Sequence, residues 1–215
     1  MRLTKLAWLF ACFILFSASL SVSAQSLKEV FSSSETPIFY LGVDFTLARA
    51  IDAPEPTMDM RDRHFPAINY LIINEPKKYD LSAAFHKSAM EHDLGLVEKR
   101  NAKINTEEIK TSNTADFSRL QEADIQKLVS GWDFGGKKGV GLLIVVEGMS
   151  KAQKGASIWV TLVDMGAKKL LMTERMIGKT SIGFGFRNYW ANPIRDVIEQ
   201  VEKRKYSEWK SKYGG

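Results

Sequence analysis

The stretch from Gly139 to Trp190 constrains the fold most, because three strand patterns, a glycine-rich segment and a helix follow one another closely. Residues 141–147 are apolar up to a final glutamate, which indicates a strand buried on both faces. Residues 156–164 are β-branched and aromatic and follow a short polar turn, which predicts an antiparallel hairpin. A third strand over residues 169–177 then completes a meander, with 141–147 as the central strand.

A glycine-rich segment, residues 178–190, follows the meander. Ile182, Phe184 and Phe186 alternate with Gly183 and Gly185, so an extended chain would carry bulk on one face and bare backbone on the other. A bare face favours close approach by a flat neighbour. That neighbour is either a helix of the same chain, a partner chain or a ligand.

The same segment predicts a binding surface, because aromatic, cationic and amide groups crowd together there as they do in interaction hot spots. Arg187 is expected to reach a carboxylate such as Glu147 or Asp164, and a structural ion pair is the alternative role for it. The candidate residues are Arg187, Asn188, Tyr189, Trp190, Phe184, Phe186, Glu147, Lys151, Asp164 and Asp44.

The last helix is expected to start with Asn192 as its cap and Pro193 at its first position, followed by apolar residues at helical spacing. Beyond it the chain is basic, over residues 203–205 and 210–212. This end is interpreted either as a solvated last turn, where cations suit the helix dipole, or as a weak contact for an anionic surface.

The amino-terminal residues have the pattern of a secretory signal peptide. Arg2 and Lys5 precede an apolar run over residues 6–16, and Val22-Ser23-Ala24 supplies the small residues of a cleavage site. Residues 1–24 are therefore predicted to direct export to the periplasm or the medium. The only cysteine, Cys12, lies within this segment, so disulfides and thiolate chemistry are not expected in the exported chain.

The rest of the chain predicts an entry linker over residues 25–36 and one α/β (α+β) domain over 37–215. We expect two or three layers, with a mixed, mostly antiparallel sheet of about five strands packed by helices. Expected strands cover 37–48 and 94–99, and expected helices cover 65–73, a segment capped by Asp80, and a segment opened by the capping box Ser118-x-x-Gln121. Residues 53–63 read as a surface loop.

Several kinds of chemistry lack a supporting pattern. Gly178-Lys179-Thr180 lacks the first glycine of a phosphate-binding loop, and Gly183-x-Gly185 lacks the third glycine of a dinucleotide fingerprint. The spacing of His86 and His92 does not suit a zinc pair on a helix. Without Arg2 and Lys5 of the signal peptide, the formal charge of +5 falls to about +3, which is mild, and the basic residues are spread among acids, so nucleic-acid binding is disfavoured. We expect no cofactor, no metal and no membrane span.

Three segments resemble a family of uncharacterised secreted bacterial proteins: Gly42-Val43-Asp44-Phe45, Asn74-Glu75-Pro76 with Tyr79, and residues 183–190. This resemblance covers most of the exported chain and implies no known activity. The order of the last elements is also similar to periplasmic α/β domains such as the amino-terminal domain of the Tol-system translocation protein. That similarity implies an interaction role.

The leading interpretation is a non-enzymatic cell-envelope protein that binds a protein partner through residues 181–190; self-association into a homo-oligomer is left open. A small-molecule or glycan binder using the same aromatic residues is the second hypothesis. The third is a hydrolase, which requires a deep cleft joining at least two of Asp44, Glu75, Glu147 and Asp164.

Overall fold

Strand β4 (Val140–Ser150) runs through the middle of the sheet, and all 11 of its residues are buried. Strands β5 (Gly155–Asp164) and β6 (Lys169–Lys179) follow it as an antiparallel meander. On its other edge β4 pairs in parallel with β1 (Ile38–Asp44) and β2 (Arg49–Ile51), and β2 pairs with β3 (Lys110–Thr111). The three strands predicted over residues 141–177, and the central place of the first, are confirmed.

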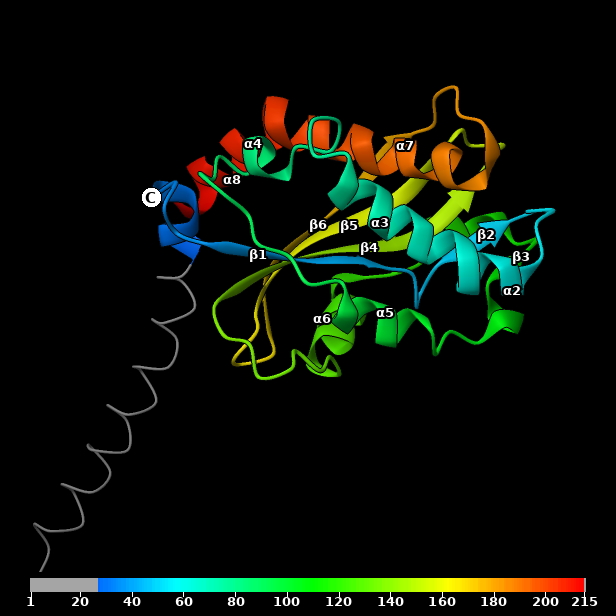
Figure 1. The fold of residues 1–215 in the computed structure, drawn as a ribbon, viewed down its shortest axis with the longest axis horizontal. Coiled ribbons are helices and arrows are strands. Elements are labelled where there is room, and N and C mark those ends of the chain that lie inside the picture. Colours follow the sequence, from blue (N-terminus) through cyan, green and yellow to red (C-terminus); the bar gives the residue numbers. More distant parts are fainter. Residues whose placement is uncertain (1–26, 215) are drawn as a thin grey trace, which may run out of the picture.

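The computed structural model describes residues 27–214, and in them helices cover both faces of this sheet (Figure 1). One layer holds α3 (Phe65–Asn74), α7 (Gly185–Gln200) and α8 (Tyr206–Tyr213), and the other holds α5 (Gly95–Asn101) and α6 (Glu122–Ser130). The predicted mixed α/β domain is confirmed, and it has three layers and six strands. The sheet is less antiparallel than expected: β4–β5 and β5–β6 are antiparallel, whereas β1–β4, β2–β4 and β2–β3 are parallel. The remaining elements are a helix over 27–32, α2 (Thr57–Asp59), α4 (Leu81–Ala84), the 3-10 helices η2 (Thr106–Glu108) and η3 (Thr114–Ser118), and the π-helices η1 (Met60–His64) and η4 (Val201–Lys205).

Strand β1 bulges between Tyr40 and Gly42, and two buried asparagines bind the backbone beyond the bulge. Asn69 of α3 accepts from the N–H of Val43 (2.7 Å) and donates to its carbonyl (3.0 Å). Asn101 of α5 donates to the same carbonyl (2.9 Å) and accepts from the N–H of Phe45 (2.9 Å). A buried backbone group needs a hydrogen-bond partner, and here the partners come from α3 in one layer and α5 in the other. Both helical layers are thereby joined to β1.

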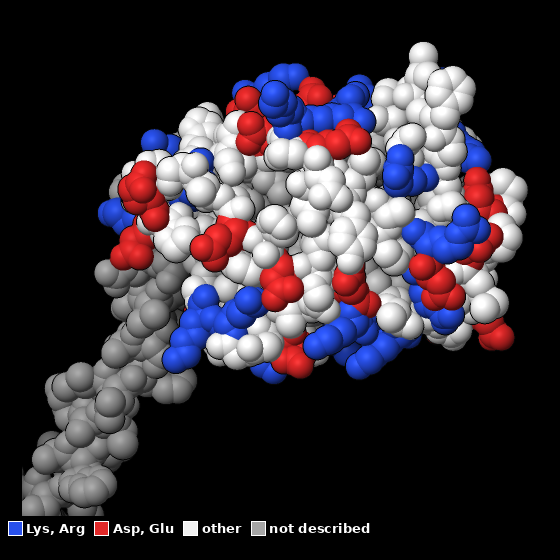
Figure 2. Space-filling view, in the orientation of Figure 1, with Lys and Arg blue, Asp and Glu red and all other residues white. Residues whose placement is uncertain are grey.

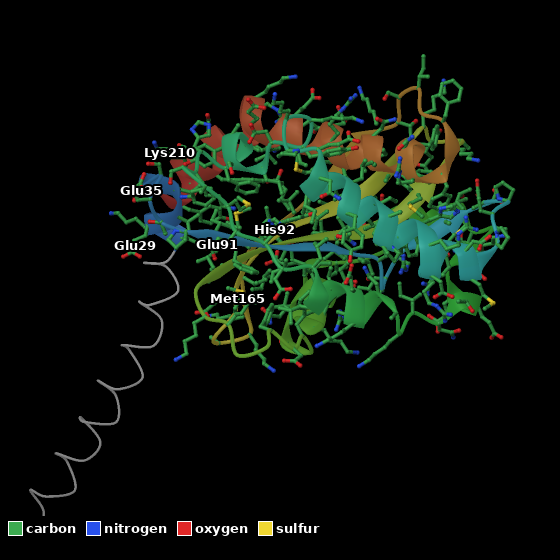
Figure 3. The ribbon with its side chains drawn as sticks, viewed as in Figure 1. Glu29, Glu35, Glu91, His92, Met165 and Lys210 are labelled. Atoms are coloured by element: carbon green, nitrogen blue, oxygen red, sulfur yellow. The ribbon has the colours of Figure 1, made fainter. Side chains whose placement is uncertain are left out.

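On the edge away from β4, the amino-terminal half of β1 is bonded by a loop rather than by a second strand. The N–H of Tyr40 donates to the carbonyl of Glu91 (2.8 Å), and Tyr40 forms an isolated bridge with His92. Figure 3 shows Glu91 and His92 beside this end of the strand. The loop therefore completes the sheet at an edge that would otherwise present unpaired groups.

Two segments have a different secondary structure from the one predicted, and both are helical. The loop expected over 53–63 is helical from Thr57, since α2 and η1 continue into α3 and bury Met60. The strand expected over 94–99 is helix α5. There Leu94 and Val97 lie three residues apart and face Gly42, where an added Cβ would stand 2.6 Å from Val97. Side chains three residues apart lie on the same face of a helix, whereas they would point to opposite faces of a strand.

Helix boundaries also differ from the prediction. Helix α7 begins at Gly185, so Asn192 and Pro193 lie inside it rather than at its start, and Phe186 and Trp190 open its buried face. Helix α6 begins after Gln121, whose N–H donates to Asp124 (2.8 Å), so Ser118 does not cap it. The helix capped by Asp80 is confirmed but ends at Ala84.

Part of the segment expected to be a linker is a helix instead. Residues 27–32 are helical, and the Phe31 ring packs at 5.6 Å from Tyr206 and 6.4 Å from Trp209. The ammonium of Lys87 donates to the carbonyls of Val30 (2.5 Å) and Ser33 (2.6 Å), which satisfies the end of this helix. The predicted signal peptide lies outside the described residues.

The basic carboxyl-terminal end is a helical continuation that packs on the core. Trp209 is buried and donates to Glu174 (2.5 Å), and Lys205 pairs with the same carboxylate (2.6 Å). Arg204 pairs with Glu208 (2.7 Å). Much of the positive charge here is thus used in ion pairs within the chain.

Substitution of Gly178 tests the contact between β6 and α7. Its added Cβ would overlap the carbonyl oxygen of Pro193, which is backbone and cannot turn aside. We expect Gly178→Ala to lower the free energy of unfolding by about 2 kcal/mol, measured by urea denaturation. Gly166→Ala is the matched control, because its Cβ would meet nothing closer than 3.5 Å. Equal losses in the two variants would contradict this account of the packing.

Candidate functional site

The prediction of an extended conformation from Ile182 to Phe186 is wrong. Strand β6 ends at Lys179, and residues 180–184 form a loop, here called the apical loop. Lys179 pairs with Gly155, the first residue of β5, so the chain beyond it has no strand to bond. Gly183 nevertheless packs closely: an added Cβ would lie 2.9 Å from the backbone nitrogen of Tyr189. The bare backbone is thus covered by the chain's own helix α7.

The apical loop exposes two large apolar side chains at one end of the molecule. Ile182 is 93% exposed and Phe184 is 87% exposed, the highest values among the described large hydrophobic residues. In the space-filling view this loop is the uncharged protrusion at the upper right (Figure 2). Exposed neighbours of this size are unusual on a monomer surface and commonly mark a contact site.

Hydrogen bonds hold the apical loop against the rest of the domain. Asn192 donates to the carbonyls of Ser181 (3.3 Å) and Ile182 (3.4 Å), and Asn188 donates to the carbonyl of Phe184 (3.1 Å). At the other end of the loop, the N–H of Thr180 donates to the carbonyl of Lys154 in the β4–β5 turn (2.9 Å). The two exposed side chains therefore stand on a backbone whose position is set by α7 and this turn.

A pocket of about 250 Å³ lies beside the apical loop, lined by Glu55, Lys151, Gly183, Gly185, Phe186, Tyr189 and Trp190. Lys151 pairs with Glu55 (3.3 Å) and lies 5.9 Å from the centre of the Tyr189 ring. The Tyr189 hydroxyl bonds Thr180 (3.3 Å). Phe186 and Trp190 are 7% and 3% exposed, so they contribute more to the core than to the pocket surface.

Arg187 does not reach the predicted carboxylates. Its guanidinium donates to Asn188 (3.1 Å) on the exposed side of α7. Asp164 instead accepts from the N–H of Ala167 (2.9 Å) in the turn that follows β5, so it is a turn residue. The structure thus brings Lys151 together with the start of α7, and it separates Asp164 from them.

Glu147 is fully buried inside the sheet and belongs to a structural cluster. Its carboxylate pairs with Arg175 (3.0 Å) and accepts from Ser157 (2.8 Å), from the Trp159 indole (3.0 Å) and from the N–H of Leu120. The Arg175 guanidinium lies 4.7 Å from the Trp159 ring centre and also donates to the Leu120 carbonyl. Such saturation with donors is what a buried charge requires.

Asp44 ends β1 and is also fully buried, in a cluster of similar composition. It pairs with Arg100 (2.7 Å) and accepts from the Trp132 indole (3.1 Å) and from the hydroxyl (2.5 Å) and N–H (2.7 Å) of Thr46. Glu75 pairs with Lys78 (3.3 Å). The four acids proposed for hydrolysis therefore each have their own partners rather than a shared cleft.

Sequence reasoning missed the groups that organise these sites. Asn192 looked like a helix cap but holds the apical loop, and Arg175 and Arg100 were not singled out although each neutralises a buried carboxylate. No local pattern marks them, because each partner lies on a different element. Within residues 27–214, no group of three or more potential ligands forms a metal cluster, and no helix combines the length and apolar composition needed to cross a bilayer.

His64 connects the start of α7 to α3. Its ring stacks on Phe186 with centroids 4.6 Å apart, and the Phe186 ring also contacts Phe65. Partial burial lowers the pKa of His64 below its ordinary value of 6.5, and the neighbouring Arg63 lowers it further. The neutral imidazole is therefore the form that suits the folded protein.

Removal of one partner tests the Glu147 cluster. We expect Arg175→Met to cost about 3 kcal/mol of unfolding free energy, because it leaves the buried carboxylate unpaired. Glu147→Gln combined with Arg175→Met should cost less than the sum of the single losses. Arg204→Met is the control, since its exposed pair with Glu208 should be worth less than about 1 kcal/mol. Additive losses in the double variant would contradict a coupled pair.

The lowered pKa of His64 predicts a pH dependence of stability. Because the unfolded chain binds this proton more readily, the unfolding free energy should fall as the pH drops below about 6.5. Denaturation at a series of pH values should show the fall, and His64→Gln should make it shallower. A titration of the His64 ring by NMR that placed its pKa above 6.5 would contradict the prediction.

No protein-family model matches this chain, and no curated protein or solved structure is detectably similar to it. The resemblance to uncharacterised secreted proteins and the similarity to the Tol-system domain therefore remain predictions from the sequence.

Proposed function

We propose that this chain is a non-enzymatic, exported interaction protein of the cell envelope, and that it binds a protein partner through the apical loop and the first turn of α7. The exposure of Ile182 and Phe184 carries the proposal. The sequence pattern of residues 1–24 supports export. The buried, fully bonded state of Asp44 and Glu147 gives the hydrolase hypothesis no support.

The two exposed side chains supply enough apolar surface for a modest, specific contact. Complete burial of an isoleucine or phenylalanine side chain is worth about 1.5–3 kcal/mol each. The bonds from Asn188 and Asn192 reduce the conformational entropy that the loop loses on binding. A partner that fits this shape offers an apolar groove, into which both side chains insert, with polar groups at its rim for Arg187.

A small molecule or glycan is the second candidate ligand for this end of the protein. The pocket beside the loop favours it, because the half-buried Tyr189 ring lies next to the Lys151–Glu55 pair. An aromatic face next to polar groups suits a sugar-like ligand. Its binding would depend on Tyr189 and Lys151 rather than on the exposed apolar side chains.

Replacement of both exposed side chains tests the proposed protein contact. A photocrosslinking residue at position 187 of the full-length chain, in its native envelope, should form a discrete adduct with one protein. In the variant Ile182→Ser/Phe184→Ser this adduct should fall at least tenfold, since about 3 kcal/mol of apolar burial would be lost. Unfolding free energy should change by less than about 0.5 kcal/mol, because neither side chain packs in the core.

Two comparisons make the result specific. The control Tyr70→Ser changes another exposed ring, 46% exposed on α3, and should leave the adduct intact. The variant Tyr189→Phe/Lys151→Gln should also leave it intact under the protein-partner proposal. Loss of the adduct in this second variant alone, with Ile182→Ser/Phe184→Ser unchanged, would instead favour the pocket as the binding site.

A further inference from the structure

A second pocket lies on the other helical layer, at the carboxyl-terminal end of β1 and far along the chain from the apical loop. It has a volume of about 230 Å³ and is open to solvent. Helix α5 forms one wall and the segment after α6 forms the other. Its lining residues are Leu96, Lys99, Arg100, Lys103, Gly131, Trp132, Asp133 and Gly135.

The side chains that line this pocket carry a net positive charge. Lys99, Arg100 and Lys103 line it, and the acidic lining residue, Asp133, already accepts a bond from the N–H of Gly135 (3.0 Å). Among the ion pairs formed within residues 27–214, none uses Lys99 or Lys103. Basic side chains gather over α5 along the lower edge of the molecule in Figure 2. The field at the pocket therefore favours an anion.

Arg100 differs from the two lysines because the protein holds it in place. Its Nε donates to Asp44, which is fully buried, and its guanidinium carbon lies 5.6 Å from the centre of the Trp132 ring. Trp132 donates to the same carboxylate oxygen of Asp44 (3.1 Å). The described residues provide no hydrogen-bond partner for the two terminal nitrogens of Arg100. The guanidinium is thus held by Asp44 at Nε, and its two terminal nitrogens can donate to a ligand.

We propose that this pocket binds a small anionic ligand that carries a phosphate or carboxylate group. The spare nitrogens of Arg100 form the fork that matches two oxygens of such a group. Lys99 and Lys103 add charge without fixed geometry. Asp44 acts as the positioning residue, since it orients Arg100 from inside the core. This site is independent of the apical loop, so its failure would leave the proposed protein contact untouched.

Titration with inorganic phosphate at constant ionic strength, in a chloride background, tests the site by NMR. Backbone signals of Gly131, Asp133 and Gly135 and the indole N–H of Trp132 should shift and saturate, with a dissociation constant on the order of 1 mM. Acetate in a parallel titration tells the two ligand groups apart: tighter phosphate binding assigns a phosphate ester, and tighter acetate binding assigns a carboxylate. Signals that move by the same amount when chloride is added in place of phosphate, and that do not saturate, would overturn the proposal.

Three variants identify the groups responsible. Lys99→Gln/Lys103→Gln should weaken binding by about tenfold, because two nearby charges are lost. Arg100→Lys keeps a cation beside Asp44, so the fold should persist, but without the fork the affinity should fall by at least about fivefold. The exposed Lys77→Gln, in the loop between α3 and α4, should bind as the unaltered protein does. Unchanged affinity in Arg100→Lys with a folded chain would overturn the assignment of Arg100.

Discussion

The complete burial of β4 is the constraint on which the rest of this structure depends. A strand with no exposed position needs strands on both edges and helices on both faces, and the chain supplies each of these. It also leaves Glu147, in the strand, with no access to water. Arg175, Ser157, Trp159 and the backbone of Leu120 replace that water, so β5, β6 and the segment before α6 must be positioned together.

The second organising feature is the irregular strand β1. It pairs with β4 alone, so the backbone groups on its other edge lack a strand, and Asn69 and Asn101 bond those of Val43 from opposite layers. Asp44, at the end of the same strand, then anchors Arg100. One buried carboxylate thus serves both the packing of α5 and the geometry of the basic pocket. This arrangement is typical of functional groups held by a rigid shell of supporting residues.

The apical loop combines exposure with order. It carries two exposed apolar side chains, and the side chains of Asn188 and Asn192 hold its carbonyls in place. Gly183 allows this close approach because it has no side chain. The two proposed contact regions therefore differ in chemistry, one apolar and protruding, the other basic and concave. They lie on elements from different helical layers.

The sequence predicted which segment would carry the candidate site, but not the secondary structure of that segment. The crowding of glycines and aromatic residues over 181–190 pointed to a segment in which Ile182 and Phe184 are exposed, yet its alternation predicted an extended strand where a loop and a helix form. The error arose because alternation records only which side chains could share a face. Whether a strand forms also depends on a neighbouring strand, and β5 ends where this one would be needed.

By itself, the sequence determined the elements that rest on local periodicity: the apolar run of β4, the hairpin to β5, the third strand, helix α3 and the Asp80 cap. These depend on residues that are close along the chain, so their physics is visible in the order of side chains. Only the tertiary structure decided the partners of Asp44, Glu147 and the apical loop carbonyls. Those partners lie up to 88 residues away, as Trp132 does from Asp44, and only the packing of the layers brings them within hydrogen-bond distance.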